Sequence, residues 1–344
     1  MELFKRGMKA ATLVTLLMGS SLTMAACSNG SATGNADNKT LTVVFLPGDS
    51  AKEVTGARQA FSKEISKATG KKVNILTTTD YNVAIQSIAS GKAQIALLGP
   101  DAYVEANAQN RQVQPLVTAT GASGTLKDAQ YHSYIMVPKN KASHYKVQGK
   151  YRLKKVAGQT ISFVSATSTS GFAVPAGAIK TALGVKQSSQ LQQSGGVFKK
   201  VLYGGSHQGS ALNLFNGDAD VAAFDDIDMT PYGELIGNPN KAGVIYKVKK
   251  DAPAPFTKVA GAQSQAIAAY PVQNEPLVAN RSQVSETDAA KIIQRLTSKQ
   301  ATNNPNFFAP INSKTHGIFT KKGKMHFIKV TDRWYEPTHK IIGK

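Results

Sequence analysis

The chain has 344 residues, which is more than one compact domain usually holds, so two globular parts with a core each are expected. Hydrophobic residues make up 41% and charged residues 18% of the sequence, which excludes a disordered or coiled-coil chain. The formal net charge is +20, and the single cysteine cannot close a disulfide within the chain. Stability must therefore come from burial of apolar side chains.

Residues 1–26 have the three-part layout of a secretory signal. A basic stretch, 5–9, precedes the apolar run 10–18, and small residues follow up to Cys27. The apolar run falls short of the ~20 residues that span a bilayer. The segment before Cys27 resembles a bacterial lipobox, which implies that Cys27 is acylated and becomes the new N-terminus. Plain secretion with a free thiol is the alternative.

Residues 27–39 are expected to form a flexible tether, because they are almost free of apolar side chains and rich in Gly, Ser and Asn. The protein is therefore expected outside the cytoplasm, anchored by its lipid to the outer face of a bacterial cell membrane. The export signal and the dispersed lysines argue against nucleic acid as a partner. The basic charge favours proximity to polyanions such as acidic lipids or wall polymers.

Strands and helices alternate in the first part of the predicted fold. Apolar runs between turn residues indicate strands, and apolar side chains at helical spacing indicate helices that Gly70 and Gly91 end. Asp80 is placed to cap one of these helices, and Val83 is expected on its inner face. The predicted elements are a strand over 41–46, a helix over 52–69, a strand over 73–76, a helix over 80–90, a strand over 94–98 and a helix from about 101.

A second part repeats this alternation. Its predicted elements are a strand over 160–164, a helix from about 171, a helix over 209–215 and a strand over 220–224, and an amphipathic helix over 285–299 follows. The segments 88–99 and 214–225 match in their helix end, glycine and Ala-rich strand. If the match is real, the loops that follow these strands occupy equivalent positions in two lobes.

The predicted fold class is α/β, a two-lobe clamp with a ligand cleft. In open α/β sheets, ligands bind beyond the carboxyl ends of the strands, so two such lobes would face each other across a cleft. Lobe one is expected to comprise 40–137 and 253–344, and lobe two 138–252. The hinge is expected near 136–138 and 248–253.

The run Ser168-Thr169-Ser170-Gly171 is the candidate ligand site. It follows a predicted strand and opens a segment with Pro175 in its first turn, which is typical of a helix N-terminus. Unpaired backbone amides, the positive end of the helix dipole and three hydroxyls would all suit a tetrahedral oxyanion. An ordinary Ser/Thr cap with solvated neighbours is the alternative.

Four short segments, in this order, resemble one family. They are 79–85 (TDYNVAI), 99–103 (GPDAY), 168–171 (STSG) with its following proline, and 206–207 (SH) before an apolar helix. Together they are similar to the phosphonate-, phosphite- and phosphate-binding lipoproteins of ABC importers over about residues 40 to 300. The resemblance implies a type II periplasmic-binding-protein clamp. It also implies a monomer that captures a small phosphorus oxyanion and delivers it to an ABC permease.

The resemblance also implies a set of ligand-binding residues. Ser168, Thr169 and Ser170 would hold the oxygens of the anion. The other positions that it places at the ligand are Tyr81, Tyr131 and His207. By themselves, the two tyrosines would be better explained by core packing, and His207 by a solvated loop.

Asp225 and Asp226 follow the last strand of lobe two and are also expected at the ligand. A carboxylate there can accept the proton of a monoprotonated phosphate or phosphite, which we favour, or bind an amine of the ligand. Phosphonate-binding members often carry another acidic residue in a segment that matches 267–271. This chain has Tyr270 there, which makes a zwitterionic aminoalkylphosphonate the less favoured ligand.

Three other functions compete with this prediction. Ser170, His207 and Asp225 occur in an order that suggests a hydrolase, but the Gly-x-Ser-x-Gly turn around the nucleophile is missing, so no enzyme is expected. A basic wall-associated adhesin that binds polyanions is the second alternative, and a binding lipoprotein for another small solute is the third. Phosphate loops and metal-ligand spacings are missing from the sequence, so no cofactor or metal is expected.

Overall fold

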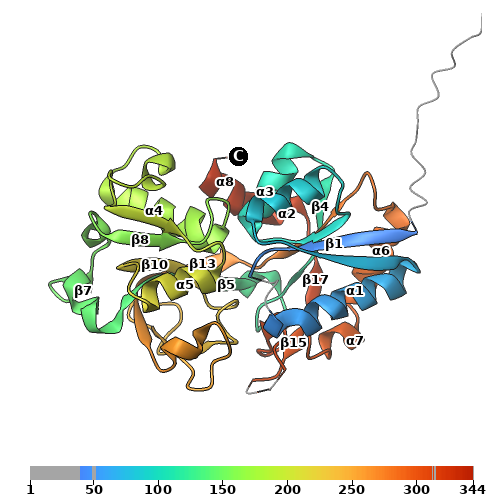
Figure 1. The fold of residues 1–344 in the computed structure, drawn as a ribbon. Helices are drawn as coiled ribbons and strands as arrows, with labels where there is room; N and C mark the ends of the chain where they lie inside the picture. Colours follow the sequence, from blue (N-terminus) through green and yellow to red (C-terminus); the bar gives the residue numbers. More distant parts are fainter. Residues whose placement is uncertain (1–38, 49–51, 312, 314, 344) are drawn as a thin grey trace, which may run out of the picture. The chain divides into compact units, whose positions relative to one another are not determined.

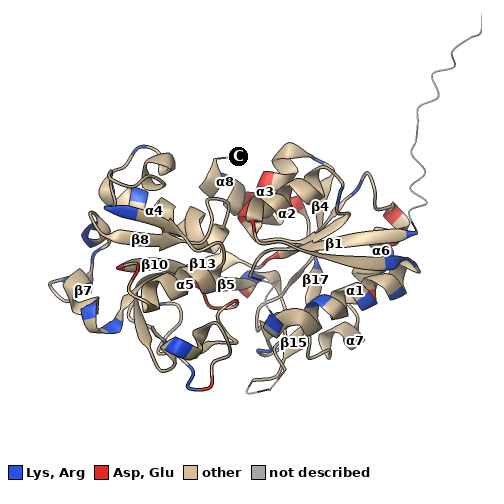
Figure 2. Cartoon of the chain, in the orientation of Figure 1, with Lys and Arg blue, Asp and Glu red and all other residues tan. Residues whose placement is uncertain are grey.

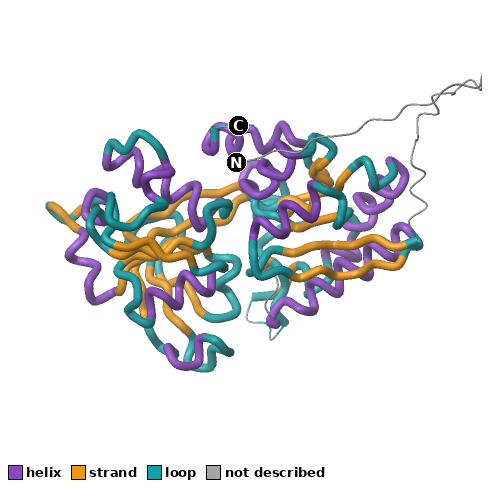
Figure 3. Tube along the Cα trace, turned by 45° about the horizontal axis from the view of Figure 1, so that its top comes forward, coloured by secondary structure: helices purple, strands orange, loops and turns teal. Residues whose placement is uncertain are grey.

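The computed structural model describes residues 39–48, 52–311, 313 and 315–343. The predicted signal, Cys27 and almost all of the predicted tether lie outside these ranges. The described chain is built on two mixed sheets with helices packed against them (Figures 1 and 3). None of its helices is both long enough and apolar enough to cross a membrane.

The first sheet has six strands in the order β17-β4-β14-β3-β1-β2. β1 pairs with β2 and β3 in parallel, whereas β14 runs antiparallel between β3 and β4. We call the part of the chain built on this sheet lobe one. Its strands are β1 (Thr40–Phe45), β2 (Lys72–Thr77), β3 (Ile95–Leu97), β4 (Val113–Ala119), β14 (Pro276–Asn280) and β17 (Phe327–Lys329).

Helices cover both faces of the lobe one sheet because its strand residues alternate between two apolar cores. In β1, Leu41 and Val43 pack in the core with α1 and α6, whereas Val44 packs in the core with α2 and α3. The helices of this lobe are α1 (Thr55–Thr69), α2 (Tyr81–Ala89), α3 (Pro100–Gln109), α6 (Glu286–Leu296), α7 (Lys299–Thr302) and α8 (Glu336–Ile342).

The second sheet has seven strands in the order β11-β12-β13-β5-β10-β8-β9, and we call the part built on it lobe two. β8 pairs with β9 and β10 in parallel, and β5 runs antiparallel between β10 and β13. The strands are β5 (Gln130–Pro138), β8 (Thr160–Phe163), β9 (Lys200–Tyr203), β10 (Val221–Asp225), β11 (Gly233–Ile236), β12 (Ile245–Val248) and β13 (Gln263–Gln273).

Lobe two also has an apolar core on each face of its sheet. Ile135 and Val137 of β5 pack in the core with α4 (Val174–Leu183), whereas Tyr134 and Met136 pack in the core with α5 (His207–Phe215). Two short strand pairs lie outside the main sheets. They are β6 (Lys146–Val147) with β7 (Lys150–Tyr151), and β15 (Phe308–Ala309) with β16 (Phe319–Thr320).

The chain passes between the sheets at two places, and both differ from the expected lobe boundaries. β5 and β13 pair with each other along nearly their whole length inside the seven-stranded sheet. The sheets therefore change at residues 120–129 and 274–275, not at 137–138 and 252–253. The sequence misplaces them because an apolar strand carries no sign of which sheet it joins until its partners are known.

Most predicted elements of the two lobes are confirmed within two or three residues. Asp80 caps α2 as expected, because its Oδ1 accepts hydrogen bonds from the amides of Asn82 and Val83. Val83 itself is 50% exposed, so its predicted place on the inner face is wrong. The helix expected from about 171 starts with a π-helical turn over Thr169–Ala173 and becomes α-helical at Val174.

Candidate functional site

The hydroxyl run begins directly after the carboxyl end of β8, where it forms the start of a helix. Ser168 is the cap, and its Oγ accepts a hydrogen bond of 3.1 Å from the amide of Gly171. Ser168, Thr169 and Ser170 are each no more than 3% exposed. The alternative of a cap with solvated neighbours is thus wrong, because the two hydroxyls beside the cap are buried.

Ser170 is the centre of a hydrogen-bonded group. Its Oγ lies 3.1 Å from the hydroxyl of Tyr131, which donates to it, and 3.3 Å from Oδ2 of Asp225, which accepts from it. The Nε2 atom of His207 lies 3.4 Å from the same oxygen. The structure therefore brings four of the predicted site residues together around one hydroxyl.

Tyr81 joins this group from lobe one. It begins α2, is 4% exposed, and its hydroxyl hydrogen-bonds the side chain of Ser168. Burial raises its pKa well above the ordinary value, as it does for Tyr131. Both phenols therefore keep their protons and can donate a hydrogen bond to an oxyanion.

His207 is a neutral imidazole with a defined tautomer. Burial lowers its pKa to about 3, so it carries no charge near neutral pH. Its Nδ1 accepts a hydrogen bond of 3.1 Å from the backbone amide of Asp225, which leaves the proton on Nε2. The Nε2–H group lies 3.4 Å from Oγ of Ser170, to which it donates, and 3.3 Å from Oδ2 of Asp225.

Three carboxyl groups lie beside these donors: Asp225 and Glu275 are buried, and Asp228 is half-buried. Burial, together with the neighbouring charge of Asp228, raises the pKa of Asp225 well above its ordinary value. Burial also raises the pKa of Asp228 to about 7, and burial with the charge of Asp228 raises that of Glu275 to about 8. Oε2 of Glu275 is buried without a hydrogen-bond partner. None of the three forms an ion pair with a Lys or Arg of the described chain.

We use the name interlobe cluster for these residues, since they come from both lobes and from the passage between them. The interlobe cluster comprises Tyr81, Tyr131, Ser168, Ser170, His207, Asp225, Asp228 and Glu275.

Thr169 links the lobes at the edge of the interlobe cluster. Its Oγ1 accepts a hydrogen bond of 2.7 Å from the amide of Asp101, at the N-terminus of α3. A Cβ atom on Gly99 would lie only 3.2 Å from the same oxygen. The loops that follow β3 and β8 thus contact each other, each at the carboxyl end of its strand.

Asp226 lies apart from these contacts, although it was expected at the ligand beside Asp225. Its Oδ1 accepts from the amide of His132 at 2.9 Å, and its Oδ2 lies 3.0 Å from Nδ1 of the same histidine. Successive residues at the end of a strand point to opposite faces, so only one of the two can face the cleft.

Sequence reasoning missed Asp228 and Glu275. Asp228 lies three residues beyond Asp225 in the loop after β10, and its amide donates to Oδ1 of Asp225 at 3.1 Å. Glu275 lies between β13 and β14, where the chain returns to lobe one. Tyr270, which occupies the expected acidic position, packs its ring against the core of lobe two instead.

The donor atoms of His207, Asp225 and Asp228 lie within 4.8 Å of one another. Imidazole nitrogens and carboxylate oxygens at this spacing can act as metal ligands. The sequence did not predict this grouping. The same three groups can share protons with an acidic oxyanion or receive an ammonium group. A cavity of about 350 Å³ lies beside Tyr81, between residues 79–82 of lobe one and 164–166 of lobe two.

Comparison with known proteins assigns the family. The model of the phosphonate ABC transporter periplasmic substrate-binding proteins matches residues 43–335. The "Phosphate-import protein PhnD" of Mycolicibacterium smegmatis is 30% identical over 247 residues, which cover 69% of this chain and 71% of that protein. The chain therefore belongs to the phosphonate-binding family of substrate-binding components of ABC importers, which confirms the resemblance found in the sequence.

Solved structures show the same fold. The binding component of an ABC phosphonate transporter from Pseudomonas aeruginosa matches with a TM-score of 0.62 at 19% identity, over 88% of this chain and 85% of that one. PhnD1 from Prochlorococcus marinus, solved in complex with methylphosphonate, matches with a TM-score of 0.60 at 19% identity, over 88% and 97% of the two chains. The predicted α/β clamp of type II is thereby confirmed.

Proposed function

We propose that the interlobe cluster is the ligand site, and that it takes one small phosphorus oxyanion, with an alkylphosphonate or phosphate as its ligand. The observation that carries this is the buried hydroxyl of Ser170, which starts a helix and is surrounded by the donors of Tyr131 and His207. Hydroxyl and imidazole donors at a helix N-terminus suit a tetrahedral anion in a site closed to water.

The hydrogen bonds inside the interlobe cluster are those that a ligand would replace. Tyr131 now donates to Ser170, and Ser170 donates to Asp225. An oxyanion between the lobes accepts from the hydroxyls and from Nε2–H of His207 in their place. The site thus loses few hydrogen bonds on binding and gains shorter ones to a charged acceptor.

The carboxyl groups set the charge that the ligand can carry. Asp225, Asp228 and Glu275 meet no Lys or Arg partner in the described chain, so wherever they are ionised they would repel a fully deprotonated anion. A monoprotonated phosphonate or phosphate can donate its proton to Asp225, and an aminoalkyl group can approach Glu275. Glu275 thus supplies the acidic group that Tyr270 does not, so an aminoalkylphosphonate is also a candidate ligand.

A calorimetric comparison of four ligands tests the proposed function. The chain, with Cys27→Ser to keep it soluble, is titrated with methylphosphonate, phosphate, phosphite and 2-aminoethylphosphonate. We expect saturable binding of at least one of them at a stoichiometry of one. If none gives heat while circular dichroism shows intact secondary structure, the ligand is a different kind of small solute and the proposal fails.

We further propose that ligand binding closes the two lobes about the passages at 120–129 and 274–275. Two contacts between the lobes support this: the bond from Asp101 to Thr169, and the approach of Gly48 to Asp228, where an added Cβ would lie 2.2 Å from Oδ2. A ligand that bridges both lobes favours the closed state by its differential affinity.

Gly48→Ala tests this closure. The new methyl group cannot fit against the Asp228 carboxylate when the lobes are together, so we expect ligand affinity to fall about tenfold, with little change in thermal stability. Gly177→Ala is the matched control, because a Cβ there meets no atom within 4 Å. Equal affinities in the two variants, measured by calorimetry, would show that the observed contact plays no part in binding.

We propose that the mature protein is a monomer that begins at an acylated Cys27, stands on the outer face of the cell membrane and serves an ABC permease. Support comes from the lipobox pattern and from the family. In the described chain, Lys and Arg are scattered over both lobes and do not follow a single element (Figure 2). The mass of the N-terminal peptide of the protein from cells tests the acylation.

A further inference from the structure

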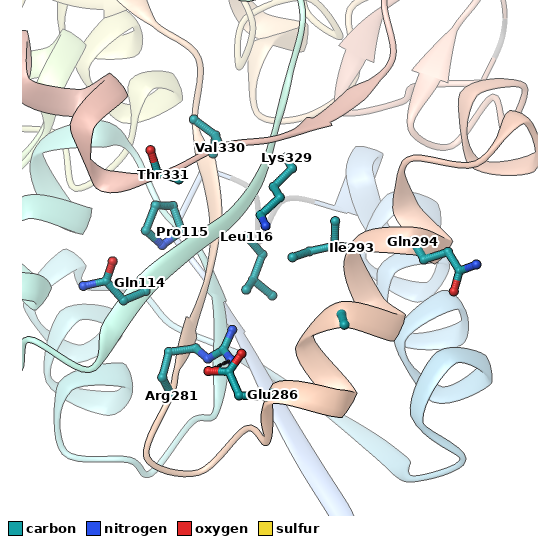
Figure 4. A pocket seen from close by; sticks show the side chains of 11 residues that line it. Gln114, Pro115, Leu116, Arg281, Glu286, Ile293, Gln294, Lys329, Val330 and Thr331 are labelled. Atoms are coloured by element: carbon teal, nitrogen blue, oxygen red, sulfur yellow. Dashed lines mark ion pairs between the residues drawn. The ribbon is translucent and has the colours of Figure 1, made fainter.

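A second cavity of about 350 Å³ opens in lobe one and shares none of its lining residues with the interlobe cluster. It lies between β4, one side of α6, and the end of β17 with the segment that follows it (Figure 4). Arg281, the first residue after β14, reaches into it from the end of that strand. The cavity is within the size range of small-molecule sites.

The guanidinium of Arg281 presents an unsatisfied edge here. The backbone of this residue is fixed by a hydrogen bond of 2.7 Å from its amide to the carbonyl of Gln112, and its side chain is only 16% exposed. Its Nε and Nη2 atoms are buried, and the one polar contact that the described residues make with them is the ion pair of Nη2 with Glu286. These two nitrogens lie along one side of the planar group, which is the side that grips a carboxylate with two parallel bonds.

One carboxylate already stands at this edge. Oε1 of Glu286, the first residue of α6, lies 2.5 Å from Nη2 of Arg281, and Figure 4 shows the two side chains facing each other. The Glu286 side chain is 95% exposed, so it can turn into water at little cost. It therefore holds the place of a carboxylate without satisfying both nitrogens, and a better partner can displace it.

The rest of the cavity suits an apolar body. Pro115 and Leu116 of β4, Ile293 of α6 and Val330 line it, and the exposed Lys329 adds a second positive charge. A cation whose bidentate edge is covered only by an exposed carboxylate, beside apolar side chains in a cavity of this size, matches a small organic acid.

We propose that this cavity, which we call the Arg281 pocket, binds a small monocarboxylate with an apolar body, and that the ligand's carboxylate replaces Glu286 on Nε and Nη2 of Arg281. The Arg281 pocket is a second binding site, independent of the phosphorus oxyanion proposed for the interlobe cluster.

The test uses 4-fluorobenzoate as the probe and fluorine NMR of the probe as the readout. We expect the full chain with Cys27→Ser to bind 4-fluorobenzoate at least tenfold more tightly than the uncharged 4-fluorobenzyl alcohol. Arg281→Gln is expected to weaken binding of the acid about tenfold, the effect of losing charged hydrogen bonds. Lys291→Gln, on α6 but outside the cavity lining, removes the same charge and is expected to leave binding unchanged.

Glu286→Gln makes the opposite prediction and changes only an exposed side chain. Removal of the competing carboxylate is expected to tighten 4-fluorobenzoate binding several-fold, which a merely structural role of Arg281 does not explain. The proposal is overturned if the alcohol binds as well as the acid, if Arg281→Gln folds and binds normally, or if Glu286→Gln leaves the affinity unchanged or weaker. The affinity of Glu286→Gln tests the proposal even if Arg281→Gln does not fold.

Discussion

Replacement of Ser170 with alanine is expected to weaken ligand binding by about 10- to 100-fold. Ser170 is 2% exposed, and its Oγ contacts Tyr131, His207 and Asp225 together. Its loss removes one donor to the oxyanion and leaves the Tyr131 hydroxyl and the Asp225 carboxylate less well satisfied, at ~1–3 kcal/mol for each unpaired group. Calorimetry with the tightest ligand of the four-compound series measures the effect.

Two comparisons separate this effect from loss of the fold. Ser189→Ala, at an exposed serine of lobe two, is the matched control and is expected to bind normally. The thermal unfolding midpoint of Ser170→Ala should stay within a few degrees of the parent, since the residue lies between the lobes and not in either apolar core. Normal ligand affinity in Ser170→Ala would show that Ser170 does not contribute to ligand binding.

The order of hydrogen bonds around His207 also favours binding over hydrolysis. In a catalytic triad, the aspartate accepts from Nδ1–H, so that Nε2 is free to take the serine proton. Here Nδ1 accepts from the Asp225 amide, and Nε2 carries the proton and donates it to Ser170 Oγ. The same three residue types are thus arranged to donate to an anion, and Ser170 meets no general base on Nε2.

The parts of the site that could be predicted are those whose position depends on local sequence. Asp80 as a cap, and Ser168–Ser170 as the start of a helix after a strand, follow from propensity and spacing over a few residues. Tyr81, Tyr131 and His207 came from the family resemblance, and the structure places all three in the interlobe cluster.

The parts that could not be predicted depend on how distant segments pair. β13 reads as an apolar strand, and nothing local places it beside β5 in lobe two. Glu275 reaches the interlobe cluster only because the chain returns to lobe one directly after β13. A buried carboxyl group is rare enough that no propensity rule points to it, so its role emerges only from the tertiary structure.

The acid groups predict that the ligand-free protein loses stability as the pH rises from about 4 to 8. Burial raises the pKa of Glu275 to about 8 and that of Asp228 to about 7, whereas unfolded carboxyl groups titrate near 4. The folded protein therefore holds protons that the unfolded chain has already released. This contribution is complete below about pH 4 and is lost as the pH rises through the folded pKa values.

At acidic pH, His207 has the opposite effect on folding stability. Its folded pKa of about 3 lies below the unfolded value near 6.5, so its contribution is complete above about pH 6.5 and is lost as the pH falls toward 3. Thermal unfolding of the ligand-free chain between pH 4 and 9 should therefore show a midpoint that declines as the pH rises to about 8, where Asp228 and Glu275 ionise in the folded protein.

The variant Glu275→Gln tests whether Glu275 causes this loss of stability as the pH rises. An amide cannot ionise, so the variant is expected to lose less stability between about pH 4 and 8 than the parent. Asp218→Asn, at an exposed carboxylate, should follow the parent curve.

Ligand binding gives an independent test, because an anion placed beside Asp228 and Glu275 raises their pKa values further. We therefore expect proton uptake on binding near pH 8, measured by calorimetry in buffers of different ionisation enthalpy. A parent curve that is flat from about pH 4 to 8, with no proton uptake, would mean that these carboxyl groups are already paired with cations in solution.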